Sequence, residues 1–141
     1  MRKIFVSYIV ILALIAVSGC RSCPMFPAEG GIYTYYFYSE SSNAGTATMP
    51  SKSAESYFVN MFIYSGESVS YTGNKDYAVK ITEKYKAKFL FAERAGDVIT
   101  EYYYSPFILK KINLNGKTVN LQIAREGGRT VIGSPIIFGS F

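Results

Sequence analysis

Three acidic side chains are the first candidates for catalysis in this sequence. Glu93, Asp97 and Glu101 are spaced four residues apart, so on a helix two of them could act as the acid and base of a glycosidase-type reaction. The surrounding residues favour β-strands and Gly96 marks a turn, so we expect these carboxylates to lie apart on a solvated surface. The three residues therefore predict no acid–base site.

The residue types that are missing exclude most other site chemistry. The sequence contains no histidine and no tryptophan, and Cys20 and Cys23 are its two cysteines. Ser-His-Asp and Cys-His sites need an imidazole to accept the proton of the nucleophile, and zinc sites draw on several Cys or His ligands. The pairs Gly30-Gly31 and Gly127-Gly128 lack the spacing of a nucleotide-binding loop and are typical of turns. We therefore expect no catalytic residue, no metal and no cofactor.

Tyrosine is the residue type in surplus. Twelve of the 13 tyrosines follow the N-terminal segment, and two aromatic runs stand out, at residues 33–38 and 102–107. A tyrosine combines an apolar ring with a polar tip, which suits protein interfaces and sugar stacking, although a β core without tryptophan could also need such rings. The candidates for a binding surface are Tyr33, Tyr35, Tyr38, Tyr102, Tyr103 and Tyr104.

The first 20 residues have the layout of a secretory signal peptide. Arg2 and Lys3 form a basic start, a mainly apolar run follows from Ile4 to Val17, and small residues precede Cys20. The run is short for a membrane-spanning helix, and small residues give a peptidase access to the backbone. We expect residues 1–19 to be removed by cleavage after Gly19, and the alternative is an uncleaved N-terminal anchor.

Residues 17–20, Val-Ser-Gly-Cys, resemble the lipobox of bacterial lipoproteins, in which an aliphatic residue stands three positions before the cysteine and small residues lie between them. The resemblance implies that Cys20 becomes the first residue of the mature chain and carries a diacylglycerol and an amide-linked acyl chain. Such a double anchor is stable, because each buried methylene contributes about 0.8 kcal/mol.

The residues after the cysteine bear on the membrane that is used. Arg21 and Ser22 stand where Gram-negative lipoproteins kept at the inner membrane often have Asp. We therefore expect an outer-membrane protein that faces the periplasm or the cell surface, a question that does not arise for a Gram-positive source.

Residues 20–31 are expected to form a lipidated tether. Pro24, Pro27 and Gly30-Gly31 favour a short extended linker that lifts the domain off the bilayer. Cys23 leaves two interpretations open, because a second cysteine in an oxidising compartment can cross-link to a partner or can remain a tether residue without one.

Length and composition predict one folded domain after the tether. Removing 19 residues from 141 leaves 122, enough for one modest core, and the chain is 49% apolar and 18% charged, unlike a disordered chain. Without Arg2 and Lys3 the chain carries 13 basic and 10 acidic residues. The lysines between residues 75 and 88 are interspersed with Asp76 and Glu83, as on a solvated face, so we expect no nucleic-acid partner.

Residue patterns predict a single β-rich domain over residues 32–141. Residues 32–38 are mainly aromatic or β-branched and predict a strand, whereas the polar stretch 39–53 predicts a mobile loop. Residues 77–91 alternate with period two, which predicts one long bent strand or two strands that meet. Residues 54–64 fit either a helix, which is favoured, or a buried strand.

The C-terminal third of the sequence predicts hairpins. Asn115-Gly116 and Gly127-Gly128 separate alternating segments, and Asn-Gly is a strong hairpin signal. The alternation predicts that Leu121 and Ile123 face the core and that Asn120 faces solvent. The expected strands are 98–104, 107–114, 118–124 and 130–138. With about seven strands in all, we expect a mainly β fold, a small antiparallel β-sandwich or a barrel-like domain.

These features favour a non-catalytic interaction or assembly protein of the cell envelope. Lipid on Cys20 would hold it at the membrane, where the domain would dock onto another envelope protein. The alternative is a glycan- or peptidoglycan-binding module that stacks sugar rings on its surface tyrosines.

Replacing Cys20 by Ala is expected to release the domain from the membrane or to stall an unprocessed precursor. The acyl chains supply the affinity, because the mature domain is expected to expose no comparable apolar area and its small net charge attracts anionic lipid weakly at physiological salt. Cys23→Ala should leave fractionation unchanged, since no run of small residues precedes Cys23. Membrane fractionation with labelled palmitate checks both variants. Normal processing and membrane retention of Cys20→Ala, or label on Cys23, would instead favour an uncleaved N-terminal helix.

Overall fold

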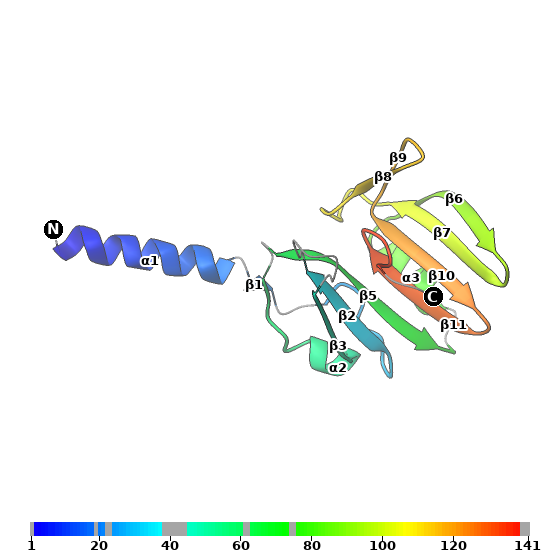
Figure 1. Ribbon diagram of the computed structural model, residues 1–141, viewed down its shortest axis with the longest axis horizontal. Helices are drawn as coiled ribbons and strands as arrows, with labels where there is room; N and C mark the ends of the chain where they lie inside the picture. The colour runs from blue at the N-terminus through cyan, green and yellow to red at the C-terminus, as the bar shows by residue number, and fades with distance from the viewer. Residues whose placement is uncertain are drawn as a thin grey trace.

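The computed structural model describes residues 2–18, 20–21, 24–37, 45–60, 63–73 and 76–138. Helix α1 (Arg2–Ser18) begins the chain and lies outside the β-rich part (Figure 1). Within the described residues, no helix combines the length and the apolar character needed to cross a membrane.

Seven antiparallel strands form the main sheet, in the order β3-β2-β5-β11-β10-β7-β6. The strands are β2 (Ile32–Phe37), β3 (Gly45–Pro50), β5 (Tyr64–Thr72), β6 (Lys88–Ala95), β7 (Val98–Tyr104), β10 (Leu121–Glu126) and β11 (Arg129–Ser134). In the described part of the chain, β3 and β6 each have one neighbour, so the sheet is open and does not close into a barrel. The predicted mainly β, antiparallel fold is confirmed.

Two short antiparallel pairs accompany the main sheet. Strand β1 (Cys20–Arg21) pairs with β4 (Val59–Asn60), and β8 (Ile112–Leu114) pairs with β9 (Lys117–Val119). Asn115 and Gly116 between β8 and β9 have φ angles of 51° and 75°, as a two-residue hairpin turn requires. This turn was predicted, as was the Gly127-Gly128 turn between β10 and β11.

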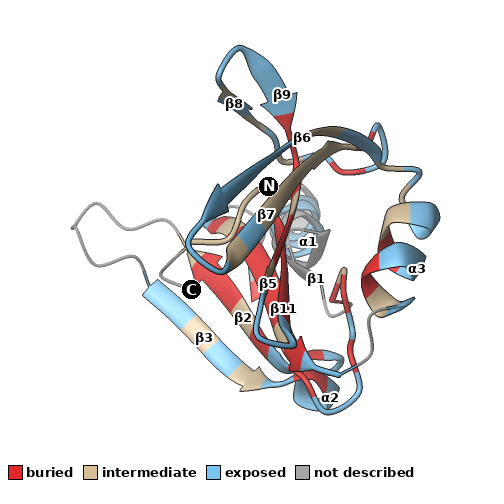
Figure 2. Cartoon of the chain, turned by 90° about the vertical axis from the view of Figure 1, so that its right-hand side faces the viewer, coloured by how far each residue is buried: buried red, intermediate tan, exposed pale blue. Residues whose placement is uncertain are grey.

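The sheet twists strongly and curls around the core (Figure 2). Strands β6 and β7 cross the direction of β2 and β3, and helix α3 (Asp76–Lys84) lies beside the buried residues. Side chains from one face of the sheet, from α3 and from the segment before β2 form the core. Its members include Phe26, Tyr33, Tyr35, Val69, Ile81, Leu121, Ile123 and Ile132.

Residues 24–31 belong to the folded domain. Phe26 is fully buried and Ala28 is nearly so, because both pack into the core cluster. Three backbone N–H groups of this segment donate to side chains of the domain: Met25 to Glu67 (3.2 Å), Phe26 to Tyr33 (3.3 Å) and Ala28 to Ser51 (2.9 Å). The prediction of an extended tether over residues 20–31 is therefore wrong from Pro24 onward.

The stretch predicted as a mobile loop contains β3 and the short helix α2 (Ser51–Ala54). Residues 39–44 of that stretch lie outside the described residues, but from Gly45 the chain pairs with β2 along the whole of β3. The side chains of β3 are mostly exposed and give no alternating apolar pattern, so the sequence does not indicate a strand here. The strand forms through backbone hydrogen bonds.

The helix predicted over residues 54–64 is also wrong. Helix α2 ends at Ala54, β4 follows at Val59, and Tyr64 already begins β5, while residues 61 and 62 lie outside the described residues. Ala54 at the end of α2 and Val59 on β4 are both fully buried. Two separate elements thus contribute apolar residues to one core, and the spacing of these residues resembled that of a single helix.

Residues 76–84 form helix α3, where period-two alternation predicted a strand. Ala78 and Ile81 are buried, whereas Val79 is 51% exposed, which is the pattern of a helix face and not of a strand. Ala78, Ile81 and Tyr85 have the spacing of one face of a helix. The alternation of Tyr77, Val79 and Ile81 has the spacing of a strand, so the sequence fits both elements. An acidic residue in the first turn and a lysine in the last turn also favour the helix.

Asn120 is buried, although the sequence pattern placed it towards solvent. Its side chain accepts a hydrogen bond from the backbone N–H of Ser105 (2.7 Å) and donates to the carbonyl groups of Ser105 (2.6 Å) and Ile108 (2.9 Å). The amide thereby satisfies three backbone groups of the loop between β7 and β8. Leu121 and Ile123 face the core as predicted.

Replacing Asn120 by Ala is expected to lower the free energy of unfolding by about 2–4 kcal/mol, because three buried backbone groups lose their hydrogen-bond partner. The matched control is Asn113→Ala, an exposed asparagine on β8, which should change stability by less than about 0.5 kcal/mol. Urea denaturation followed by circular dichroism measures both. Equal midpoints for the two variants would contradict the role of Asn120.

Candidate functional site

The structure does not bring the six candidate tyrosines together on one surface. Tyr33 and Tyr35 on β2 are fully buried in the core, and Tyr38 lies outside the described residues. The three tyrosines of β7, at 102, 103 and 104, are partly exposed. Among the candidates that the structure describes, the tyrosines of β7 are the accessible ones, and Tyr33 and Tyr35 serve packing.

Tyr33 is buried because it helps to hold a buried carboxylate. Glu67 on β5 accepts hydrogen bonds from the hydroxyl groups of Tyr33 and Tyr64 (2.6 Å for Tyr64) and from the backbone N–H of Met25. Burial and the neighbouring carboxylate raise the pKa of Tyr33, so its phenol remains a proton donor. The sequence contained a signal for Glu67, since it shares a strand face with buried Val69.

The hairpin of β6 and β7 exposes aromatic and aliphatic side chains on both faces. On one face Phe91 stacks on Tyr102, with ring centroids 4.5 Å apart, and on the other Phe89 contacts Tyr103 edge-on at 5.7 Å. Phe89 is 57% exposed and Ile99 is 42% exposed. We call these five residues the hairpin surface.

Carboxylates orient both tyrosines of the hairpin surface. Tyr102 donates its hydroxyl to Glu93 (3.0 Å) and Tyr103 donates to Glu101 (3.0 Å), which also forms an ion pair with Arg125 at 2.5 Å. Burial and the hydrogen-bonded carboxylate raise the pKa of Tyr102, and the same two causes raise the pKa of Tyr103 to about 12. Glu93 on β6 is paired with Thr100 of β7, the residue next to Glu101. Because neighbouring residues of a strand point to opposite faces, Glu93 and Glu101 lie on opposite faces and form no acid–base pair.

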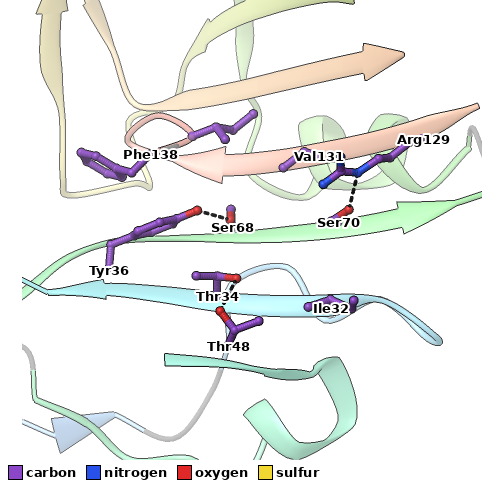
Figure 3. A pocket seen from close by; sticks show the side chains of 10 residues that line it. Ile32, Thr34, Tyr36, Thr48, Ser68, Ser70, Arg129, Val131 and Phe138 are labelled. Carbon is purple, nitrogen blue, oxygen red and sulfur yellow. Dashed lines mark hydrogen bonds between the residues drawn. The ribbon is translucent and has the colours of Figure 1, made fainter. Parts of the chain in front are cut away.

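A polar cleft of about 240 Å³ lies on the other face of the sheet from the core (Figure 3). Strands β2, β3, β5 and β11 form its floor. Arg129 stands at one end of the cleft and Phe138 at the other. The five hydroxyl-bearing residues that line it are Thr34, Tyr36, Thr48, Ser68 and Ser70.

The polar groups of the cleft are arranged in pairs. Hydrogen bonds join Thr34 to Thr48 (3.2 Å), Tyr36 to Ser68 (3.0 Å) and the Nε of Arg129 to Ser70 (3.0 Å). Such a lining offers hydroxyl groups and one guanidinium to a ligand, which suits a hydroxyl-rich or anionic molecule. No pattern in the sequence pointed to this cleft, because its residues come from four strands and the C-terminal segment.

The C-terminal segment forms one wall of the cleft. Its residues 135–138 pack closely against β5 and β11, where a Cβ at Gly66 would collide with the ring of Phe138 and a Cβ at Gly133 would collide with Ile137. The backbone N–H of Ile137 donates to the side chain of Gln122 (2.7 Å). Strand β11 therefore ends at Ser134, earlier than the predicted 138, and the following residues turn across the sheet.

The predicted lipid site lies at the opposite end of the β-rich part from the hairpin. Cys20 on β1 pairs with Asn60 of β4, whereas Gly19 and Cys23 lie outside the described residues. No group of His, Cys, Asp or Glu among the described residues could hold a metal ion.

Comparison with known proteins adds no relative to this picture: no family model, no curated protein and no solved structure matches the chain. Functional inference therefore depends on the hairpin surface, the polar cleft and the N-terminal sequence.

Proposed function

We propose that the chain is a lipid-anchored envelope protein that acts as a non-catalytic interaction or assembly protein, and that the hairpin surface contacts its protein partner. The observation that carries this proposal is the exposure of apolar side chains on both faces of a sheet edge. Phe89 and Ile99 are large and exposed on the face that carries Tyr103, and on the other face half-buried Phe91 stacks on Tyr102. Aromatic residues in such clusters contribute much of the binding free energy at protein interfaces.

The edge strand adds a second mode of contact. On its outer side β6 has no neighbouring strand in the described part of the chain, so this edge can pair with a strand of another protein. The carbonyl of Leu90 on β6 already accepts a hydrogen bond from Lys117 (3.3 Å). Lys88, Glu93 and Arg94 place both charge signs along this edge, which limits pairing to partners of complementary charge.

The placement of the hairpin supports a role away from the membrane. In Figure 1 the β6–β7 hairpin lies at the end of the molecule remote from α1 and β1. An anchor on Cys20, which the lipobox resemblance implies, would leave the hairpin projecting into the periplasm or the exterior.

Replacing Phe89 by Ser together with Ile99 by Thr is expected to reduce cross-linked complexes in membranes at least about tenfold, because interface aromatics in exposed clusters contribute on the order of 2 kcal/mol or more. Quantitative cross-linking in membranes, followed by mass spectrometry, measures this. The control is Phe58→Ser, which removes an aromatic ring outside the hairpin that is even more exposed than Phe89 and should leave cross-linking unchanged. Recovery of monomer alone from the parent protein, at every detergent concentration, would count against the proposal.

A second candidate function is glycan or peptidoglycan binding in the polar cleft. Its support is the lining of five hydroxyl groups with Arg129 at one end, a set that can bond sugar hydroxyls and a carboxylate. Sugar stacking on surface tyrosines, which the sequence suggested, is left with fewer candidate residues, since Tyr33 and Tyr35 are buried.

Arg129→Gln is expected to weaken binding to purified peptidoglycan about tenfold, because a charge-assisted hydrogen bond is lost. Arg94→Gln, on exposed β6, is the matched control and should bind as the parent does. A pull-down on peptidoglycan and a glycan array measure the affinities. Blank results for the parent in both assays would eliminate this candidate.

A further inference from the structure

A second exposed apolar surface lies beside the N-terminal segment. Leu109 is 88% exposed and Phe107 is 59% exposed. Phe107 and Leu109 border a cavity of about 180 Å³ together with Met25 and Tyr64. We call Phe107 and Leu109, which border this cavity together, the anchor-side patch.

Lysines surround the anchor-side patch. The Nζ atom of Lys110 lies 4.7 Å from the centre of the Tyr64 ring and donates to the carbonyl of Tyr64, and the Nζ atom of Lys86 lies 5.5 Å from the Phe107 ring. Lys111 is exposed next to them. Residues 105–111, which contribute Phe107 and Leu109, include two lysines and no acidic side chain. Glu67, which is bonded to Met25 and Tyr64 of the same cavity, is fully buried.

The patch lies at the end of the domain where the chain reaches Cys20. Met25, which borders the same cavity, is five residues from Cys20, a stretch that spans at most about 17 Å. The pairing of β1 with β4 also places Cys20 opposite Asn60, four residues before Tyr64, which borders the same cavity. A lipid on Cys20 would therefore hold this end of the domain at the bilayer.

We propose that the anchor-side patch rests on the surface of that bilayer, with Leu109 and Phe107 at the boundary between headgroups and acyl chains and the lysines against anionic headgroups. This inference rests on the proposed membrane anchoring. Exposed apolar side chains rimmed by lysines are the composition of interfacial membrane contacts, and anionic lipid attracts each nearby lysine. The contact would give the domain a fixed orientation, with the β6–β7 hairpin directed away from the bilayer (Figure 1).

The test uses the full chain, isolated from membranes and reconstituted into vesicles of phosphatidylcholine and phosphatidylglycerol. In a Cys23→Ser background, Leu109→Cys carries a polarity-sensitive fluorophore, and Asp97→Cys at the hairpin tip is the matched control. On reconstitution the label at 109 should become about threefold less accessible to a water-soluble quencher, while the label at 97 should not change. Neutral vesicles and the additional change Lys111→Glu should each reduce the protection at 109.

Equal quenching at the two positions in anionic vesicles, with the protein still floating with the lipid, would overturn the inference and leave the anchor standing. Mass spectrometry of the N-terminal peptide reports lipid on Cys20 independently, so failure of the anchor is seen separately. Protection at 109 that is present before vesicles are added, together with a doubled mass, would assign the patch to a second copy of the chain and also overturn the inference.

Discussion

The buried carboxylate of Glu67 constrains how the N-terminal half of the domain is put together. A carboxylate removed from water is strongly unfavourable unless hydrogen bonds compensate for its lost hydration. Glu67 receives them from Tyr33 on β2, from Tyr64 on its own strand and from Met25 of the preceding segment. A shift of β2 by one residue would move Tyr33 to the other face of the sheet and remove one donor. The side chain of Glu67 therefore couples the register of β2 to the docking of residues 24–31.

The elements that sequence patterns predicted correctly are those whose local signal has one meaning. Two-residue hairpin turns require positive φ angles, which Asn115-Gly116 and Gly127-Gly128 adopt. Residues 77–84 failed as a strand because their apolar positions satisfy both periodicities, and the burial of Ala78 and Ile81 against the core decides for the helix. Strand β3 was not predicted, because its mostly exposed side chains show no alternating apolar pattern. Backbone pairing with β2 forms this strand.

The candidate sites were less accessible to sequence reasoning, since they depend on contacts between distant segments. The tyrosine-rich run of β2 resembled a binding surface, but a tyrosine hydroxyl is equally suited to a buried carboxylate, and Tyr33 and Tyr35 lie in the core. Glu67 was not singled out from the sequence, although it shares a strand face with buried Val69 and is itself fully buried. The polar cleft joins residues 32 to 138, and no local pattern reports such a combination.

The docking of the segment before β2 also determines how the domain would bear mechanical load. A pull applied through the N-terminus reaches Met25, whose N–H is bonded to Glu67 in the middle of the sheet and whose carbonyl accepts the hydroxyl of Tyr85 (3.0 Å). The neighbouring bonds to Tyr33 on β2 and to Ser51, directly after β3, share the load. Under the proposed anchoring, tension from the membrane would therefore be shared among several hydrogen bonds around the core, none of which involves the far edge strand β6.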